Sequence, residues 1–192
     1  MNTPMPGHRR ALCCLGAIAL SPLCAAAAPP LPGNSVYQLP AALVDQDGRS
    51  MDWSALRGGP VLVSMFYSSC EMVCPVIFET IAQTIKALPA PGRDRVRVLM
   101  VSFDPARDTV AVLKDTAQRH GCGTNWTLVR ASEADARRIA AVLGVQYRRL
   151  ESGEFNHAST IELLDGEGRI ARRSGLLGAV DPALVGALER QL

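Results

Sequence analysis

The sequence predicts one α/β domain, and three observations support this fold class. Segments typical of strands alternate along the chain with segments of helical periodicity. Two of the strand segments, residues 61–67 and 96–103, are continuous apolar runs, as expected of central strands buried on both faces. The 192 residues contain no internal repeat and suffice for one domain, or two small ones, with a core that needs no disulfide bonds.

The composition is that of a folded chain with no affinity for nucleic acid. Apolar residues make up 48%, charged residues 20% and aromatic residues 5%, which excludes disordered and collagen-like chains and leaves few rings for stacking on bases. The formal charge of +2 falls to zero without Arg9 and Arg10. A neutral chain lacks the electrostatic attraction that binds nucleic acids and anionic lipids.

Residues 1–28 have the organisation of a signal peptide. A basic stretch at 8–10 precedes ten apolar residues at 11–20, and small residues at 24–28 offer a cleavage site. The apolar block is shorter than the roughly 20 residues of a membrane-spanning helix. The alternative is an uncleaved N-terminal anchor in the inner membrane. Either form predicts that the rest of the chain works in a bacterial periplasm.

The first elements after this segment are a linker, a hairpin and a central strand. Residues 29–40 are rich in proline and predict a linker, so the folded domain is expected to span 41–192. Residues 42–44 and 50–51 flank an Asp-Gly turn, which predicts an N-terminal β-hairpin. The apolar strand at 61–67 follows a Gly-Gly-Pro break.

A helix, a second strand and another helix follow this central strand. Apolar residues recur at helical spacing over 75–88, and Pro89 ends that helix. The second apolar strand, 96–103, leads to a helix over 109–120 that Gly121 ends.

The C-terminal part continues the alternation with shorter elements. Ser132 begins a capping box, which predicts a helix running to Leu143 and stopping at Gly144. The other expected elements are three short strands and a closing helix, at residues 126–129, 160–164, 169–172 and 182–191.

The cysteines give the first indication of function. Those expected to leave with the signal peptide are Cys13, Cys14 and Cys24. Three cysteines then remain, at Cys70, Cys74 and Cys122. An odd number in an oxidising compartment means that at least one thiol is unpaired or engaged in chemistry.

Cys70 and Cys74 lie where the central strand enters its helix. Pro75 is tolerated only in the first turn of a helix, so both cysteines are expected at or just before a helix N-terminus. The free N–H groups and the helix dipole there favour the thiolate, which binds soft metals and attacks disulfides.

A purely structural disulfide is the alternative for this pair. Closing so short a loop contributes only about 2 kcal/mol in the chain-entropy model. Cβ atoms one helical turn apart lie roughly 5–6 Å from each other, whereas a relaxed disulfide needs about 3.8 Å. A weak and strained bond is a poor staple, so metal binding or redox cycling is favoured.

A third metal ligand should come from elsewhere in the chain, and two histidines remain once the signal peptide is removed. His120 follows Arg119 at a predicted helix end, where a surface role is expected. His157 lies in a predicted loop, 154–160, that enters an apolar strand, and loops at sheet edges often assemble sites. Taken alone, His157 would still be assigned to capping or to the surface.

Three segments resemble the Sco/SenC family of copper-binding proteins. Residues 67–75, YSSCEMVCP, are similar to the metal loop Y-T-x-C-P-D-x-C-P of that family. Residues 101–109, VSFDPARDT, resemble its V-S-x-D-P-x-R-D-T strand end, and residues 157–168 follow its H-S-x-x-x-Y-L-x-D-P-x-G pattern. The CxxxCP motif alone is only modestly specific, but three matches in this order are strongly so.

The resemblance implies a thioredoxin-like fold, in which a central mixed β-sheet is flanked by helices and the hairpin forms an N-terminal extension. It also implies that Cys70, Cys74 and His157 together bind copper, as Cu(I) or Cu(II). Two thiolates and an imidazole suit both oxidation states. A structural zinc site would usually need a fourth protein ligand.

The function implied by the resemblance is that of a periplasmic metallochaperone rather than an enzyme. It would deliver copper to the dinuclear site of a cytochrome c oxidase subunit or to another periplasmic acceptor. One alternative is a thiol–disulfide oxidoreductase, in which Cys70 and Cys74 would reduce the cysteines of that site. Another is a copper or redox sensor.

The chain departs from the family pattern around the metal loop. Glu71 and Met72 replace the usual Pro-Asp. Met72 could offer a thioether to Cu(I), but packing in the core is the favoured role. Cys122 matches nothing in the pattern and is expected to be an inert thiol or a partner in an intermolecular disulfide. We expect three further residues to act only in helix capping and a surface ion pair: Asp104, Arg107 and Asp108.

Overall fold

A seven-stranded mixed β-sheet organises the fold, with strand order β2-β1-β5-β4-β3-β8-β9. The central strands β3, β4 and β5 are parallel, and their neighbours β1 and β8 run antiparallel to them. The expected α/β class with a central mixed sheet is therefore confirmed. The strands of this sheet are β1 (Ala42–Asp45), β2 (Ser50–Asp52), β3 (Val61–Phe66), β4 (Arg97–Ser102), β5 (Trp126–Arg130), β8 (Ile161–Leu164) and β9 (Ile170–Ser174).

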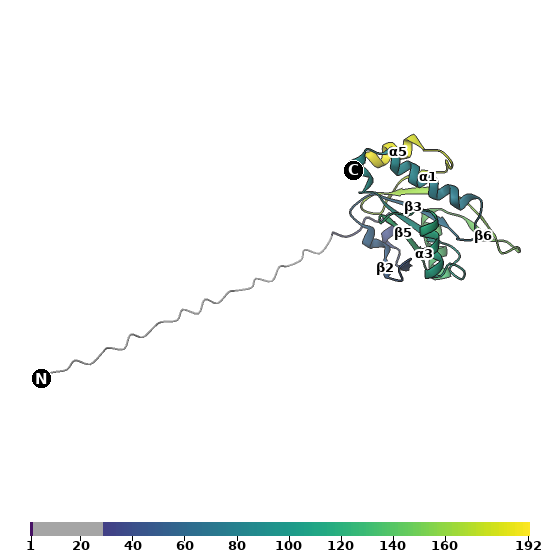
Figure 1. Cartoon of the computed structure of the whole chain (residues 1–192), viewed down its shortest axis with the longest axis horizontal. Helices are drawn as coiled ribbons and strands as arrows, with labels where there is room; N and C mark the ends of the chain where they lie inside the picture. The colour runs from purple at the N-terminus through teal and green to yellow at the C-terminus, as the bar shows by residue number, and fades with distance from the viewer. Residues whose placement is uncertain (2–28) are drawn as a thin grey trace. The chain divides into compact units, whose positions relative to one another are not determined.

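This computed structural model describes Met1 and residues 29–192, and residues 31–192 form one compact unit (Figure 1). Apart from Met1, the predicted signal peptide at 1–28 lies outside the described residues. Within the part of the chain that is described, no helix is long and apolar enough to cross a membrane.

The two apolar runs of the sequence form the centre of the sheet. Every residue of β3 is buried, and so are all residues of β4 after Arg97. The two strands pair in parallel register up to Phe66 opposite Ser102, so their carboxyl ends finish side by side. Segments that leave such an edge together are well placed to build a site.

Helices flank the sheet. The α-helices are α1 (Val73–Ala87), α2 (Ala90–Arg93), α3 (Val110–Arg119), α4 (Glu133–Leu143) and α5 (Pro182–Glu189). Helices α1 and α5 pack against each other and lie side by side in Figure 1. The N-terminal half of α1 also reaches the end of α3, because the ring of Phe78 stacks on His120 with centroids 4.1 Å apart.

Local sequence signals fix several helix ends. The Thr109 hydroxyl accepts from the Val112 N–H at the start of α3, and the Ser132 hydroxyl accepts from the Asp135 N–H at the start of α4. Gly144 ends α4 with a left-handed φ of 73°, as the capping pattern predicts.

The main difference from the sequence-based prediction is a two-stranded ribbon, outside the main sheet, in the part expected to be loop. Strands β6 (Tyr147–Arg149) and β7 (Phe155–His157) pair antiparallel. The predicted loop at 154–160 is therefore partly strand. Strands of three residues carry too few alternations of polarity to be distinguished from loops in a sequence. The other elements not predicted are α2 and two 3-10 helices, η1 (Val36–Gln38) and η2 (Trp53–Leu56).

The segment expected as a linker contributes to the core. Val36 and Tyr37 of η1 are buried, and the Tyr37 ring packs edge-on against Trp53 at a centroid distance of 6.1 Å. The Ser35 hydroxyl donates to the Glu167 carbonyl at 2.6 Å, which joins the segment to the turn between β8 and β9.

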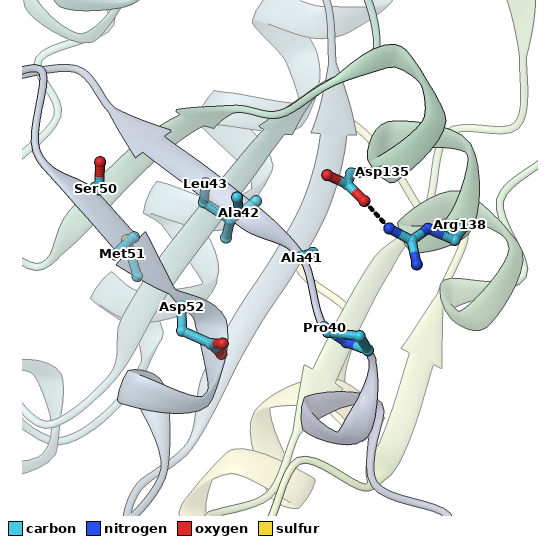
Figure 2. Close-up of a pocket in the computed structure, with 9 residues that line it drawn as sticks. All are labelled: Pro40, Ala41, Ala42, Leu43, Ser50, Met51, Asp52, Asp135 and Arg138. Atoms are coloured by element: carbon cyan, nitrogen blue, oxygen red, sulfur yellow. Dashed lines mark hydrogen bonds and ion pairs between the residues drawn. The ribbon is translucent and has the colours of Figure 1, made fainter.

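The predicted N-terminal hairpin extends one edge of the sheet through β1. An open hollow of about 520 Å³ lies between this hairpin and α4, and Figure 2 shows the residues that line it. Asp135 and Arg138 form an ion pair on its α4 side. The remaining lining residues come from the hairpin and the two residues before it, at 40–43 and 50–52.

Candidate metal centre

The structure brings Cys70, Cys74 and His157 together. Their ligand atoms, the two sulfurs and an imidazole nitrogen, all lie within 4.8 Å of one another. Both cysteines are buried and the histidine is half-buried. Among the residues described, these three side chains are placed to bind one metal ion, although the chain separates the histidine widely from the thiols.

The end of β3 and the start of α1 position the two sulfurs. The Cys70 N–H donates to the Tyr67 carbonyl, which turns the chain immediately after β3. Cys74 follows in the first turn of α1, and its N–H points at the Cys70 sulfur, 3.4 Å away. Helix α1 begins at Val73, two residues earlier than predicted.

The two thiols differ in acidity because burial acts on both, while the compensating hydrogen bonds are mainly to Cys70. Burial raises the pKa of Cys70, but hydrogen bonds from Cys74 and from the Met72 and Val73 N–H groups outweigh it, so the net pKa is lowered. Burial raises the pKa of Cys74, and the neighbouring Cys70 raises it further. Cys70 therefore ionises to the thiolate more readily, whereas Cys74 keeps its proton.

The β6–β7 ribbon positions the imidazole. Phe155 and His157 are two residues apart in β7, so their side chains lie on the same face of the ribbon. The Phe155 ring packs against Tyr67 and Phe103, each at a centroid distance of 5.1 Å. This contact turns the shared face of the ribbon inward and directs His157 toward the thiols.

The ring of His157 is oriented by its own neighbours. Its Nδ1 lies 3.3 Å from the Ala158 carbonyl oxygen and 3.2 Å from the Ser159 hydroxyl. Donation from Nδ1–H to the carbonyl leaves the Nε2 lone pair for a metal. Burial lowers the pKa of His157, which favours the neutral, ligating form.

Asp108 supports the loop between β3 and α1 that carries Cys70, here called the thiol loop. The Asp108 side chain is buried, contrary to the expected surface role. It is 1% exposed and accepts hydrogen bonds from the hydroxyls of Ser68 and Ser102. Burial raises its pKa. Thr109, not Asp108, caps α3. The predicted ion pair does form between Arg107 and Asp104, but Asp104, in the turn between β4 and α3, is buried rather than on the surface.

Met72 is exposed, so the favoured role in the core is wrong. Its exposed fraction is 85%, because it occupies the turn that precedes α1, where its side chain points to solvent. His120 is half-buried at the end of α3, where burial lowers its pKa, and it is not part of the ligand cluster. Cys122 is a free, half-buried thiol whose pKa burial raises to about 11.

A cavity of about 350 Å³ opens beside the thiols. Cys70 and Cys74 line it together with the loop that follows β3, and Phe78 and His120 form its far wall. The thiols are therefore reachable from a side that His157 does not occupy, since His157 is not among the lining residues.

Comparison with known proteins agrees with this arrangement. The SCO1/SenC family model matches residues 32–182, which cover all three candidate ligands and most of the chain. This chain belongs to the SCO1/SenC family.

Named relatives and solved structures are similar to this chain. The SCO2-like protein of Rickettsia prowazekii is 26% identical over 136 residues, covering 68% of this chain and 65% of that protein. The chain thus spans just under two thirds of that relative. The structure of Bradyrhizobium japonicum ScoI with copper bound has a TM-score of 0.69 and 25% identity, covering 80% of this chain and 98% of that one.

A second solved structure extends the likeness. BsSco is described as having a disulfide switch and as a member of the Sco family of cytochrome c oxidase assembly proteins. It has a TM-score of 0.67 and 22% identity, covering 79% of this chain and 90% of that one. The thioredoxin-like fold expected from the sequence is confirmed by these neighbours of the SCO1/SenC chain.

Sequence reasoning missed the residues that hold the ribbon in place. Tyr67, Phe103 and Phe155 form an aromatic cluster against the His157 ring. Tyr67 and Phe103 lie in motifs similar to those of the family, whereas Phe155 lies in the predicted loop at 154–160. Nothing in the sequence pairs them, because their contacts join segments far apart in the chain.

Proposed function

We propose that this chain binds one copper ion through Cys70, Cys74 and His157 and passes it to an acceptor as a metallochaperone. The observation that carries the proposal is the convergence of two sulfurs and an imidazole nitrogen within 4.8 Å. The copper-bound structure of Bradyrhizobium japonicum ScoI supports the choice of metal.

The chemistry of the donor set also supports copper. Thiolates are soft ligands and imidazole is a borderline one, a combination that suits Cu(I) at low coordination number and also accepts Cu(II). Structural zinc sites use four protein ligands, and the group found among the described residues has three. Three ligands with an open side allow an acceptor to displace them one at a time.

The proposed acceptor is the dinuclear copper site of a cytochrome c oxidase subunit, or another copper protein of the periplasm. The description of BsSco as a member of a family of oxidase assembly proteins supports this choice. Residues 1–28 support export, because they combine a basic start, an apolar block and small residues. The intact mass of the exported protein will show whether this segment is removed.

Copper binding is tested by titrating the reduced protein with Cu(I) and measuring the stoichiometry. One equivalent is expected to bind. We expect Cys70→Ser and Cys74→Ser to abolish tight binding and His157→Ala to weaken it by tenfold or more. Matched controls are Cys122→Ser and His120→Ala, which remove a thiol and an imidazole outside the cluster. Equal loss in a control and its counterpart would contradict the proposal.

Thiol–disulfide exchange is the second candidate, favoured by the unequal acidity of the two cysteines. The Cys70 thiolate would attack a disulfide of the acceptor and release one acceptor thiolate, forming a mixed disulfide. Cys74 would then lose its proton and attack Cys70, releasing the second acceptor thiolate. The acceptor gains two electrons and the chain is left with one disulfide.

The His157→Ala variant separates the two candidates. Exchange needs both cysteines but not the imidazole, whereas copper transfer needs all three ligands. A variant that still reduces an acceptor peptide disulfide at the wild-type rate, and that keeps Cu(I) affinity unchanged, would favour the oxidoreductase.

A further inference from the structure

We propose that Glu154 and Arg107 are positioning residues that hold His157 against the thiols. This inference rests on the proposed metal site and names the contacts that assemble it. The element concerned is the β6–β7 ribbon, residues 147–157.

The ribbon needs fastening because it is not part of the main sheet. Its strands form ladder pairs only with each other, from Tyr147 opposite His157 to Arg149 opposite Phe155. The position of the imidazole relative to Cys70 therefore depends on side-chain contacts between the ribbon and the rest of the domain.

The first fastening joins the ribbon to the thiol loop. The Tyr67 hydroxyl donates to Glu154 Oε2 at 2.6 Å. Tyr67 is 4% exposed, follows β3 directly and precedes Cys70 by three residues, so it moves with the thiols. Glu154 precedes His157 by three residues on the ribbon. This hydrogen bond thus links the two halves of the site through short, stiff stretches of chain.

The second fastening joins the ribbon to the end of β4. Arg107 Nη2 donates to the Gly153 carbonyl at 2.7 Å. The same guanidinium pairs with the buried carboxylate of Asp104 and lies over the Phe155 ring, 5.9 Å from its centroid. Asp104 fixes the guanidinium, and the guanidinium fixes the turn of the ribbon.

The aromatic packing between these two contacts cannot by itself fix the position of the ribbon. Phe155 rests on Tyr67 and Phe103 and supplies apolar contact, but such contact tolerates sliding. Hydrogen bonds are directional and set the position of the ribbon along the surface. Glu154 and Arg107 therefore determine the position of the His157 imidazole relative to the thiols.

Hydrogen exchange of the metal-free protein tests the fastening without reference to copper. The ribbon amides to follow are those of Leu150 and Ala158, which donate to Glu154 and Gln146 carbonyls. We expect Glu154→Ala to speed their exchange about tenfold, the effect of losing one hydrogen bond to a charged group. Glu154→Gln keeps an acceptor and should exchange more slowly than the alanine variant. Glu151→Ala, an exposed acid of the same turn, is the control.

A double-mutant cycle identifies the partner. Tyr67→Phe retains the ring and removes the hydroxyl, which also has a hydrogen bond with the Phe155 backbone. It should therefore speed exchange at least as much as Glu154→Ala, and adding Glu154→Ala to Tyr67→Phe should speed it no further. Arg107→Lys keeps a cation beside Asp104 and should loosen the same amides by losing the donor to Gly153.

The copper readout is the dissociation rate of Cu(I). We expect Glu154→Ala to raise it about tenfold and to leave the stoichiometry at one. Exchange and dissociation rates equal to those of Glu151→Ala would overturn the inference. Failure of the metal site itself would show differently, as a His157→Ala variant with unchanged copper binding while Glu154→Ala still loosens the ribbon.

Discussion

Cys70 and Cys74 are four residues apart, and yet their pKa values are shifted in opposite directions, down for Cys70 and up for Cys74. Hydrogen bonds from the start of α1 converge on the Cys70 sulfur, whereas Cys74 is 2% exposed and receives less compensation for its burial. A helix N-terminus favours a thiolate only where its free N–H groups point. One residue of the pair is thus prepared to attack or to bind first.

This difference predicts the order of alkylation. In the reduced, metal-free protein, iodoacetamide should modify Cys70 before Cys74, because the thiolate is the reactive form. Peptide mapping by mass spectrometry over a time course measures the order. Faster labelling of Cys74 would contradict the assignment of the thiolate to Cys70.

Asp108 shows how a residue far from any ligand role supports the site. Its carboxylate joins Ser68 of the thiol loop to Ser102 at the end of β4. We expect Asp108→Ala to lower the free energy of unfolding by about 2–4 kcal/mol, because it leaves the buried Ser102 hydroxyl and the half-buried Ser68 hydroxyl without this acceptor. Denaturant unfolding measures this. Asp115→Ala, an exposed acid on the following helix, should cost less than about 1 kcal/mol.

Glu162 is a buried acid in the centre of β8. It is 0% exposed and accepts from Arg173 Nε at 3.0 Å across the β8–β9 pair. Burial raises its pKa above the ordinary 4.5, and the bond from Arg173 only partly offsets this. The folded state therefore prefers the protonated carboxyl more than the unfolded state does.

Stability should accordingly fall with rising pH relative to a neutral variant. Because the pKa is raised on folding, the stabilising contribution of Glu162 is complete below about pH 4.5 and is lost as pH rises through the folded pKa. The difference in unfolding free energy between wild type and Glu162→Gln should shrink or reverse across that range. A difference that grows with pH would mean that Arg173 stabilises the carboxylate overall.

At the scale of elements, Gly168 links the N-terminal segment to the sheet. Its φ is +77°, and a Cβ there would lie 2.5 Å from the Tyr37 ring and 2.7 Å from the Ser35 hydroxyl. The β8–β9 turn and η1 can approach each other only because this position has no side chain.

Gly168→Ala should therefore destabilise the protein by more than backbone strain alone. Gly121→Ala is the matched control, since Gly121 has a φ of +61° and nothing within 4 Å of the added Cβ. We expect about 1 kcal/mol for the control and about 2 kcal/mol or more for Gly168→Ala, measured by denaturant unfolding. Equal losses would show that η1 moves aside without cost.

The elements differ in how far their sequences determine them. The strands β3 and β4 and the helices α1, α3 and α4 were predictable, because apolar runs, periodicity and capping residues are local signals. The ribbon was not predictable, since it depends on contacts with Phe103 and Tyr67, which are distant in the sequence. Its own three-residue strands show no clear alternation of polarity. The position of His157 was for the same reason available only from the family resemblance.

The burial of Asp108 and the exposure of Met72 were also beyond local signals. Acids near a helix start are usually solvated and methionines usually packed. Here the loop that leaves β3 reverses both expectations, since it covers Asp108 and turns Met72 outward.

At the scale of the whole molecule, the candidate metal site joins two segments that lie far apart in the sequence, at Cys70–Cys74 and at His157. A ligand that binds only the folded state raises stability, by about 2.7 kcal/mol at a free concentration of 100 times its Kd. Cu(I) buffered at that free concentration should therefore raise the Tm of the reduced protein by roughly 5–10 °C. His157→Ala should show a smaller rise by calorimetry. An equal rise in both would mean that the thiols alone hold the ion.

The two outermost strands of the sheet have a consequence for how copies of the protein meet. An unpaired strand edge is a template on which further molecules can aggregate unless it is short or charged. Here β2 has only three residues, and β9 presents exposed Arg172 and Arg173. Both edge strands thus discourage intermolecular β-pairing. The protein should therefore remain monodisperse at high concentration.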